Sequence, residues 1–334
     1  MTELPPVMEP VSFKDRSTGL KIFGVILTGL GALCGLMTLL LILGGLMMSH
    51  SSANALPPIY TSGPPSMVLP VLIYSVLTIV QIWLGVGAFL AKRWARTLIM
   101  ILSWSGIYIG VLMAVLFGFF AKNFTPPPGG PPNAAAIQAV GMAFMAVLFG
   151  IFFIALPASM AWFFTKQDVK LTCEERHPTP SWTDRCPPTV LYMTLWQLFS
   201  AATMSVLPLT YHGTVPQFGV IFSGLPGAAI CLVEAGLLAV SAVLYFRLSP
   251  AGWWLMLGMM VVLLASGLMN TMFLDFPGLY QAMGYSGPEL DKLLQFNFMQ
   301  GGFGVAFILV SLGPGFALLA WTRRYFSGLS PKYT

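Results

Sequence analysis

Eight stretches of this chain are long and apolar, and few charged residues interrupt them. They lie near 20–48, 67–91, 95–121, 136–165, 189–209, 218–246, 252–274 and 299–322. An α-helix rises about 1.5 Å per residue, so roughly 20 apolar residues cross the hydrocarbon core of a bilayer. Charged residues make up only 8% of the chain, which is too few to cover the surface of a soluble fold. The sequence therefore predicts an all-α integral membrane protein with eight transmembrane helices.

Positive charges gather at one set of helix ends. If both termini are cytoplasmic, the cytoplasmic segments hold all but two of the 16 lysines and arginines, and only Lys122 and Lys292 fall outside. Positive residues resist translocation, so this bias predicts cytoplasmic termini and a location in the cell inner (plasma) membrane. The net charge of +5 follows from the same bias. The partners that we expect are therefore the lipid bilayer and other membrane proteins, and no nucleic acid.

Landmarks recur along the chain. The second and sixth apolar segments both end in a tight turn, and the fourth and eighth both carry a proline, then Ala-Trp and a basic exit. These matches predict a tandem duplication of a four-helix unit. An even number of helices per unit makes the two repeats parallel, related by an axis along the membrane normal. The expected parts are a cytoplasmic tail (1–19), a first four-helix repeat (20–165), a cytoplasmic linker loop (166–188), a second four-helix repeat (189–325) and a cytoplasmic tail (326–334).

One turn also carries a resemblance. The run GVGAFLAKRWARTLIMILSW, from Gly85 to Trp104, joins a glycine-rich helix end to two basic residues and the turn Arg-Trp-Ala-Arg at 93–96. It resembles a turn shared by uncharacterised multi-pass bacterial membrane proteins. The resemblance covers one helical hairpin in each half. It implies the membrane class and the location, and no chemistry.

Glu234 is the only acidic residue well inside a predicted span. A carboxylate at that depth costs roughly 2–3 kcal/mol or more, so it is expected to face the protein interior, protonated or paired. This placement favours a proton or cation site. The alternative is a neutral carboxyl that is hydrogen-bonded to a neighbouring helix, at Gln197 or Asn270. Gln81 is the apparent counterpart of Glu234 in the first half.

Two prolines, Pro157 and Pro314, interrupt the fourth and eighth predicted helices at corresponding positions. Each frees a backbone carbonyl, which must find another partner or face a wet cavity. Broken helices at corresponding positions can mark a transporter site. The alternative is a simple kink that lets the helices pack.

Histidines and cysteines form two thin sets of possible metal ligands. His50 and His212 follow the first and fifth spans, which are equivalent positions in the two halves. Cys173, His177 and Cys186 share the polar linker, with the spacing Cys-x₃-His-x₈-Cys. Neither set has the closely paired ligands that are typical of zinc sites. We therefore expect polar interface residues in the first case, a surface loop ordered by Trp and Pro in the second, and no cofactor.

The last outer loop differs from the others. Ser286 can cap a helix there, Pro288 suits its first turn, and Leu290, Leu293 and Leu294 fall on one face. The sequence predicts a short amphipathic helix that leads into the eighth span.

Two classes of function remain open. In a transport-type protein for a small molecule or ion, Glu234, Gln81 and the broken helices would line a shared polar cavity. In a non-catalytic structural subunit or assembly factor of a membrane complex, the core would be filled. The sequence has no nucleotide-binding loop and no His-Glu-x-x-His run, so no enzymatic activity is expected. The intramembrane carboxyl favours the transport-type protein.

Overall fold

The computed structural model describes residues 13–50, 65–123, 134–295 and 299–326. In these residues, eight helical segments are long and apolar enough to cross a membrane. This confirms the expected number of spans and is consistent with an all-α membrane protein. The tails at 1–12 and 327–334 and the proline-rich loops at 51–64 and 124–133 lie outside the described residues. The spanning helices are α1 Ser17–His50, α2 Pro65–Phe89, α3 Arg93–Asn123, the pair α4 Ala134–Phe149 and α5 Leu156–Phe164, α7 Pro188–Thr210, α8 Leu225–Phe246, α9 Pro250–Phe273 and α12 Gly301–Thr322.

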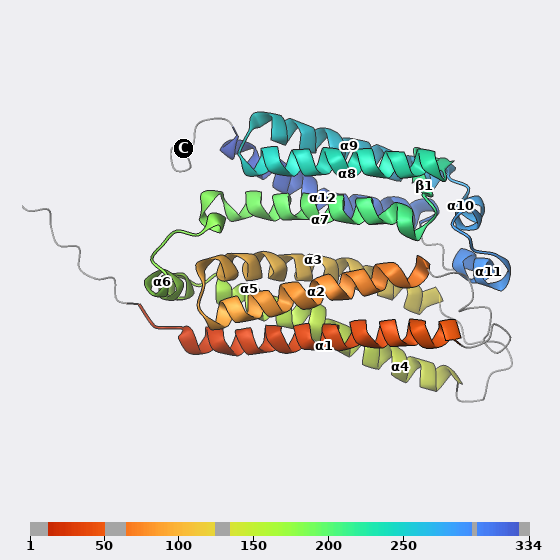
Figure 1. The fold of residues 1–334 in the computed structure, drawn as a ribbon. Helices are drawn as coiled ribbons and strands as arrows, with labels where there is room; N and C mark the ends of the chain where they lie inside the picture. Colours follow the sequence, from red (N-terminus) through yellow and green to blue (C-terminus); the bar gives the residue numbers. More distant parts are fainter. Residues whose placement is uncertain (1–12, 51–64, 124–133, 296–298, 327–334) are drawn as a thin grey trace, which may run out of the picture.

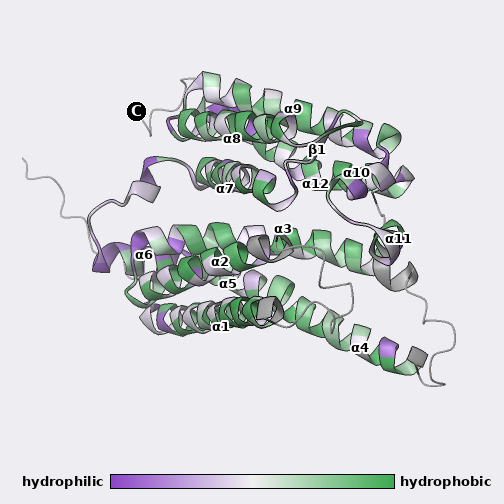
Figure 2. Cartoon of the chain, turned by 45° about the vertical axis from the view of Figure 1, so that its right-hand side comes forward, coloured by the Kyte–Doolittle hydropathy of each residue, from purple (hydrophilic) through white to green (hydrophobic). Residues whose placement is uncertain are grey.

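The long helices lie side by side in two groups (Figure 1). Helices α1 to α5 form one group, and α7, α8, α9 and α12 form the other. The closest packing is within each group, above all between α1 and α2 and between α7 and α8. The groups meet where α7 packs on α2 and α3. Hydrophobic residues fill the middle of the helices and hydrophilic residues collect toward the ends (Figure 2).

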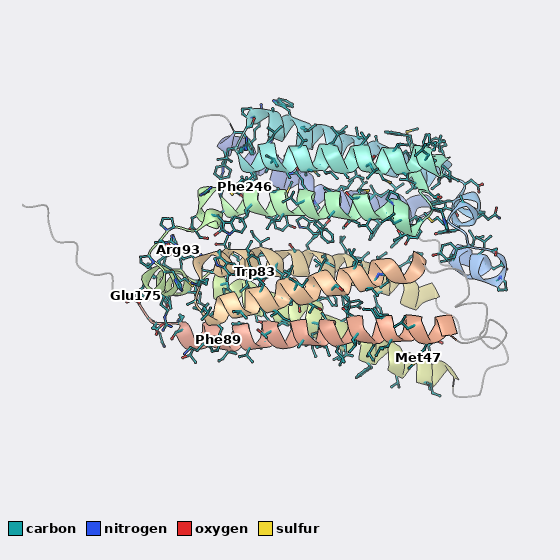
Figure 3. All side chains as sticks on the ribbon, viewed as in Figure 1. Met47, Trp83, Phe89, Arg93, Glu175 and Phe246 are labelled. Atoms are coloured by element: carbon teal, nitrogen blue, oxygen red, sulfur yellow. The ribbon has the colours of Figure 1, made fainter. Side chains whose placement is uncertain are left out.

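The outside of the bundle is apolar. Met47 of α1 is 71% exposed and Phe89 of α2 is 48% exposed, and both lie on the α1–α2 pair (Figure 3). The fourth span is the most exposed, because an 18-residue window of Ala136–Phe164 contains no buried residue. Exposed apolar surface on this scale is favourable only in lipid or against another apolar surface.

The fourth span is broken at the position that its proline predicts. The segment Gly150–Ala155 between α4 and α5 is wound as a π-helix, and Pro157 follows it in the first turn of α5. In a regular α-helix the N–H of residue 157 would bond to the Phe153 carbonyl, and proline has no N–H. That carbonyl lies against Gly110 of α3, only 2.5 Å from where a Cβ would stand. By contrast, Pro314 lies inside a continuous α12.

Two tight turns join α2 to α3 and α8 to α9, as expected. Each places a non-glycine residue in the left-handed region, Ala91 with φ +52° and Leu248 with φ +56°. The hydrogen bonds agree position by position: the N–H of Lys92 bonds to the Gly87 carbonyl (2.9 Å), and that of Ser249 bonds to the Leu244 carbonyl (3.0 Å). This is the six-to-one bond of a Schellman motif, which pairs the last carbonyls of a helix.

The sixth helix begins later than predicted. The residues before it form the strands β1 Val215–Gln217 and β2 Val220–Phe222, which pair antiparallel with Gln217 opposite Val220. The predicted range 218–246 is therefore wrong at its start, and α8 begins at Leu225. A short apolar run of Phe, Val and Ile fits a strand as well as a helix, so the pattern alone could not separate them.

Four further helical segments of the described residues lie outside the spans. The linker expected as a loop instead contains α6 Gln167–Arg176 and the 3₁₀-helix η3 Trp182–Arg185. The amphipathic helix expected in the last outer loop is present as α11 Gly287–Gln295, and a further helix, α10 Phe276–Ala282, precedes it. Below, the end of the bundle that carries α6 is the α6 end, and the end that carries β1 and β2 is the hairpin end (Figure 1).

Candidate functional site

Glu234 lies near the middle of α8, as the tenth of its 22 residues. Its side chain is half-buried. It is also the only Asp, Glu, Lys, Arg or His in α7, α8, α9 and α12. A single carboxyl in such an apolar set of helices needs a polar partner, and the structure provides one from outside the helices.

The partner comes from the hairpin β1–β2, which precedes α8 and contacts both α8 and α9. Its turn consists of Phe218 and Gly219, with φ of +51° and +81°. Two positive φ values are what a two-residue turn of type I′ requires. Glycine adopts them freely, whereas a bulky residue such as Phe218 does so only when surrounding contacts hold it.

Two side chains of α9, one helical turn apart, hold that turn. Ser266 Oγ accepts a hydrogen bond from the Phe218 N–H at 3.2 Å. Asn270 makes two bonds, because its Oδ1 accepts from the Gly219 N–H at 2.7 Å and its Nδ2 donates to the Pro216 carbonyl at 3.3 Å. Backbone groups that are withdrawn from water need such partners, since neither lipid nor apolar side chains supply any.

The hydrogen bonds continue from α9 to Glu234. Ser266 Oγ donates to Gln217 Oε1 at 2.7 Å, and Gln217 Nε2 donates to Glu234 Oε1 at 2.6 Å. The donors and acceptors in this row of hydrogen bonds are consistent. The Phe218 N–H can only donate to Ser266 Oγ, so the Ser266 hydroxyl hydrogen is left to donate to Gln217. The Gln217 amide therefore turns its nitrogen toward the carboxyl and its oxygen toward α9.

This arrangement differs from the partners that the sequence predicted. Gln217, which the sequence analysis missed, contacts Glu234, while Asn270 holds the same hairpin one step away. Gln197 is buried in α7, where its Nε2 donates to the Met193 carbonyl of its own helix at 3.3 Å and its Oε1 has no hydrogen-bond partner. The signal that could have revealed the hairpin is the pair of polar residues, Ser266 and Asn270, spaced four apart on an otherwise apolar helix.

Gln81 occupies a different place. Its Oε1 lies 3.9 Å from the Cys34 Sγ of α1, within the first group of helices. Helices α2 and α8 lie on opposite sides of α7 (Figure 1). These contacts do not bring Gln81 to Glu234, so they do not form the shared polar cavity that the transport hypothesis predicted.

The two histidines predicted at equivalent positions, His50 and His212, lie in different local structures. His50 is the last residue of α1, and its side chain lies outside the described residues. His212 follows α7 with φ +53°, and its carbonyl accepts the Gly224 N–H at 3.1 Å, which closes the base of the hairpin. Among the residues that the structure describes, no group of three or more His, Cys, Asp or Glu side chains is placed to hold a metal ion.

The linker residues predicted as possible zinc ligands pack into the α6 end. Cys173 and Cys186 are free thiols with 1% and 2% exposure, and burial raises the pKa of each to about 11. His177 Nε2 lies 3.0 Å from the Leu90 carbonyl at the end of α2. Buried thiols with high pKa values are poor nucleophiles and poor ligands, so these contacts fit a structural role.

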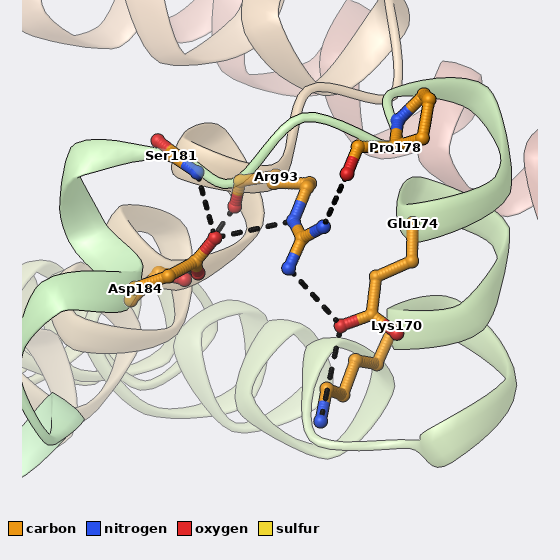
Figure 4. A network of polar contacts seen from close by, with 7 residues as sticks. Arg93, Lys170, Glu174, Pro178, Ser181 and Asp184 are labelled. Atoms are coloured by element: carbon orange, nitrogen blue, oxygen red, sulfur yellow. Dashed lines mark hydrogen bonds and ion pairs between the residues drawn. The ribbon is translucent and has the colours of Figure 1, made fainter. Parts of the chain in front are cut away.

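Ion pairs attach this linker to the first group of helices. Arg93, at the start of α3, bonds to Glu174 of α6 at 3.4 Å and to Asp184 of η3 at 3.2 Å (Figure 4). Arg16, just before α1, pairs with Asp168 at 3.2 Å. Each pair is partly exposed and contributes little alone, about 0.2–1 kcal/mol. Together they fix α6 and η3 over the ends of α1 and α3.

No protein-family model, no curated protein and no solved structure matches this chain. What the protein can do is therefore inferred from the geometry around Glu234 and the hairpin.

Proposed function

We propose that this chain is a transport-type membrane protein that moves an ion or small solute, with Glu234 as the reactive group of its site. One observation carries the proposal: the only carboxyl in four apolar helices is hydrogen-bonded to a non-helical segment that contacts two of those helices. A carboxyl inside a membrane span is costly and is characteristic of ion and proton pathways. Irregular backbone inside a membrane is tolerated where it is buried in protein or lines a wet cavity, as in transporters.

A two-half organisation supports the same function. Three pairs of landmarks recur at one spacing of 157 positions: the left-handed turn residues, the prolines of the fourth and eighth spans, and two glycines of α3 and α9 that face the following span. The pairs are Ala91 with Leu248, Pro157 with Pro314, and Gly110 with Gly267. A common spacing favours two parallel four-helix repeats. At this spacing the counterpart of Glu234 is Leu77, one helical turn from Gln81, so the carboxyl belongs to the second half only.

The proposed orientation places the α6 end in the cytoplasm of a bacterial cell and the hairpin end outside. The basic residues at the α6 end support it, since positive residues resist translocation. Reporter fusions after residues 213 and 285 are expected on the outer face and a fusion after residue 175 on the inner face. A fusion at 175 that reports the outer face would overturn the orientation.

The transport function is tested on the purified protein in lipid vesicles. Charge movement is recorded after gradients of H⁺, Na⁺, K⁺ and a panel of small solutes are imposed. We expect at least one gradient to give a signal that Glu234→Gln abolishes. Glu175→Gln is the matched control, because it makes the same change at an exposed residue of α6 (Figure 3) and should leave the signal intact. If every gradient gives the same result for the natural protein and for Glu234→Gln, the proposal is wrong.

The second candidate, a subunit or assembly factor, is favoured by α4. Its outer residues, such as Val140 at 70% exposure, face away from the rest of the chain, and the π-helical segment separates it from α5. A photo-crosslinking amino acid at Val140 in native membranes tests this candidate. A discrete crosslinked protein would favour it, and crosslinks to lipid alone would count against it.

A further inference from the structure

We propose that Glu234 binds a proton rather than a metal cation, and that Gln217 on the hairpin is the residue that positions it. The inference rests on the proposed function only for the claim that this proton moves across the membrane. The binding site itself is argued from the hydrogen bonds around Glu234.

The side-chain oxygens of Gln217, Ser266 and Asn270, which link the hairpin to Glu234 and α9, already accept hydrogen bonds. Gln217 Oε1 accepts from Ser266, Ser266 Oγ accepts from the Phe218 N–H, and Asn270 Oδ1 accepts from the Gly219 N–H. The group that Gln217 presents to Glu234 is an N–H donor. Hard metal cations need several oxygen ligands that point at the ion; Ca²⁺, for example, takes about six to eight. A donor hydrogen on the carboxyl repels such a cation.

The same side chains can satisfy both protonation states of Glu234. The observed hydrogen bonds, from Ser266 to Gln217 and from Gln217 to Glu234, suit a charged carboxylate. When the carboxyl takes a proton, rotation of the Gln217 amide by half a turn lets its oxygen accept from the new O–H. Its nitrogen then donates to Ser266 Oγ, and the Ser266 hydroxyl can donate to a carbonyl of its own helix. No donor or acceptor is lost in either state.

Few other groups compete for the proton. The hairpin, α7, α9 and α12 contain no Asp, Glu, Lys, Arg or His in their described residues. The titratable side chains on α7 and α8 are Tyr192 near the α6 end, Cys231 one turn before Glu234, and Tyr245 near the α6 end of α8. Cys231 is buried, and its thiol is the nearest of these along the helix. Within the hairpin and these four helices, a change of protonation near neutral pH therefore falls on Glu234, because His212 and Asp275 lie outside these elements.

Labelling by dicyclohexylcarbodiimide, an apolar reagent that reacts with protonated carboxyls, tests the inference on the full-length protein in lipid vesicles. Peptide mass spectrometry reads the modification at Glu234 across a pH series, with and without saturating Na⁺, K⁺ or Ca²⁺. We expect labelling that is lost as pH rises, is absent in Glu234→Gln, and is unchanged by any of the three cations. In Gln217→Leu, labelling should persist to higher pH, because the charged carboxylate loses its donor.

Two results would overturn the inference: protection of Glu234 by a metal cation at constant pH, or no labelling of Glu234 at any pH. Both are measured on the unaltered protein, so a variant that fails to fold does not affect them. The outcome is also separable from the proposed function. Proton-dependent labelling without any charge movement in vesicles would refute transport and leave the proton site standing. Cation protection together with cation flux would do the reverse.

Discussion

The side chain of Asn270 should decide how firmly the hairpin is seated on α9. It is the one residue there that bonds to the hairpin backbone twice, through the Gly219 N–H at 2.7 Å and the Pro216 carbonyl at 3.3 Å. Asn270→Leu keeps a similar volume and removes both bonds. The two backbone groups would then remain half-buried without partners, and the turn at Phe218 and Gly219 would lose one of its two supports.

The size of the effect follows from those two groups. A buried polar group left without a partner costs about 1–3 kcal/mol, and half-burial places these two near the lower end of that range. The hairpin should therefore be destabilised by about 2 kcal/mol, which corresponds to a roughly thirtyfold increase in the fraction of time it is detached. The spanning helices do not depend on these bonds, so the destabilisation should be local.

Amide hydrogen exchange of the protein in lipid nanodiscs measures this directly. We expect the peptide that contains Gly219 to exchange roughly thirtyfold faster in Asn270→Leu, while peptides from α7 and α8 keep their protection. Thr271→Val is the matched control, because Thr271 is the adjacent residue, and its hydroxyl bonds to the Leu268 carbonyl of its own helix at 2.8 Å. Unchanged exchange at Gly219 in Asn270→Leu, or equal acceleration in both variants, would refute the argument that Asn270 seats the hairpin.

Three further outcomes are expected. Gly110→Ala should lower the free energy of unfolding by about 1–3 kcal/mol, because the new methyl would stand 2.5 Å from the Phe153 carbonyl oxygen. Gly118→Ala, in the same helix, meets open space and should leave the melting temperature unchanged. Arg93→Ala should speed proteolysis within the α6–η3 linker, because it removes two partly exposed ion pairs worth about 0.2–1 kcal/mol each. Arg93→Lys should restore only part of the resistance to the protease, because lysine lacks the forked geometry of the guanidinium. Since burial raises the pKa of the Cys173 thiol to about 11, alkylation of the folded protein should be slow at pH 8, rise steeply as the pH approaches 11, and become fast at pH 8 on unfolding, as followed by mass spectrometry.

The spans were predictable because their signal is additive. About 20 apolar residues in a row outweigh any single polar or helix-breaking residue, so eight long helices follow from hydropathy alone. Pro208 shows the principle, since α7 continues through it to Thr210 despite the missing N–H. The tight turn at Ala91 was likewise visible from its basic and aromatic residues. The left-handed conformation of that residue was not, because alanine has no preference for it.

The candidate site was only half predictable, because it joins residues that are distant in sequence. Glu234 was visible as a charge in an apolar segment. Gln217 was not, since its role depends on a hairpin whose turn is Phe-Gly rather than the Asn-Gly that marks such turns. The turn of that hairpin is held by Ser266 and Asn270, about 50 residues further along the chain. Local sequence patterns carry no information on the contact between the hairpin and α9. The sequence therefore predicted Glu234 as a site residue but could not predict Gln217 as its partner.

The two polar attachments of the bundle lie at opposite ends and belong to different groups of helices. The described ion pairs that join the α6 linker to the rest of the chain go to the first group of helices and the residues just before it, to Asp15, Arg16 and Arg93. The hairpin bonds to α8 and α9 in the second half. The halves themselves meet along α7, which packs on α2 and α3, and through the Tyr108 hydroxyl of α3, which donates to the Ser311 carbonyl of α12. A change of charge at Glu234 therefore acts first on the hairpin and α9, and among the described contacts it reaches the other group of helices across α7 and α12. If the two groups move against each other, the linker travels with the first and the hairpin with the second, and the motion falls on the contacts of α7 and α12 with α2 and α3.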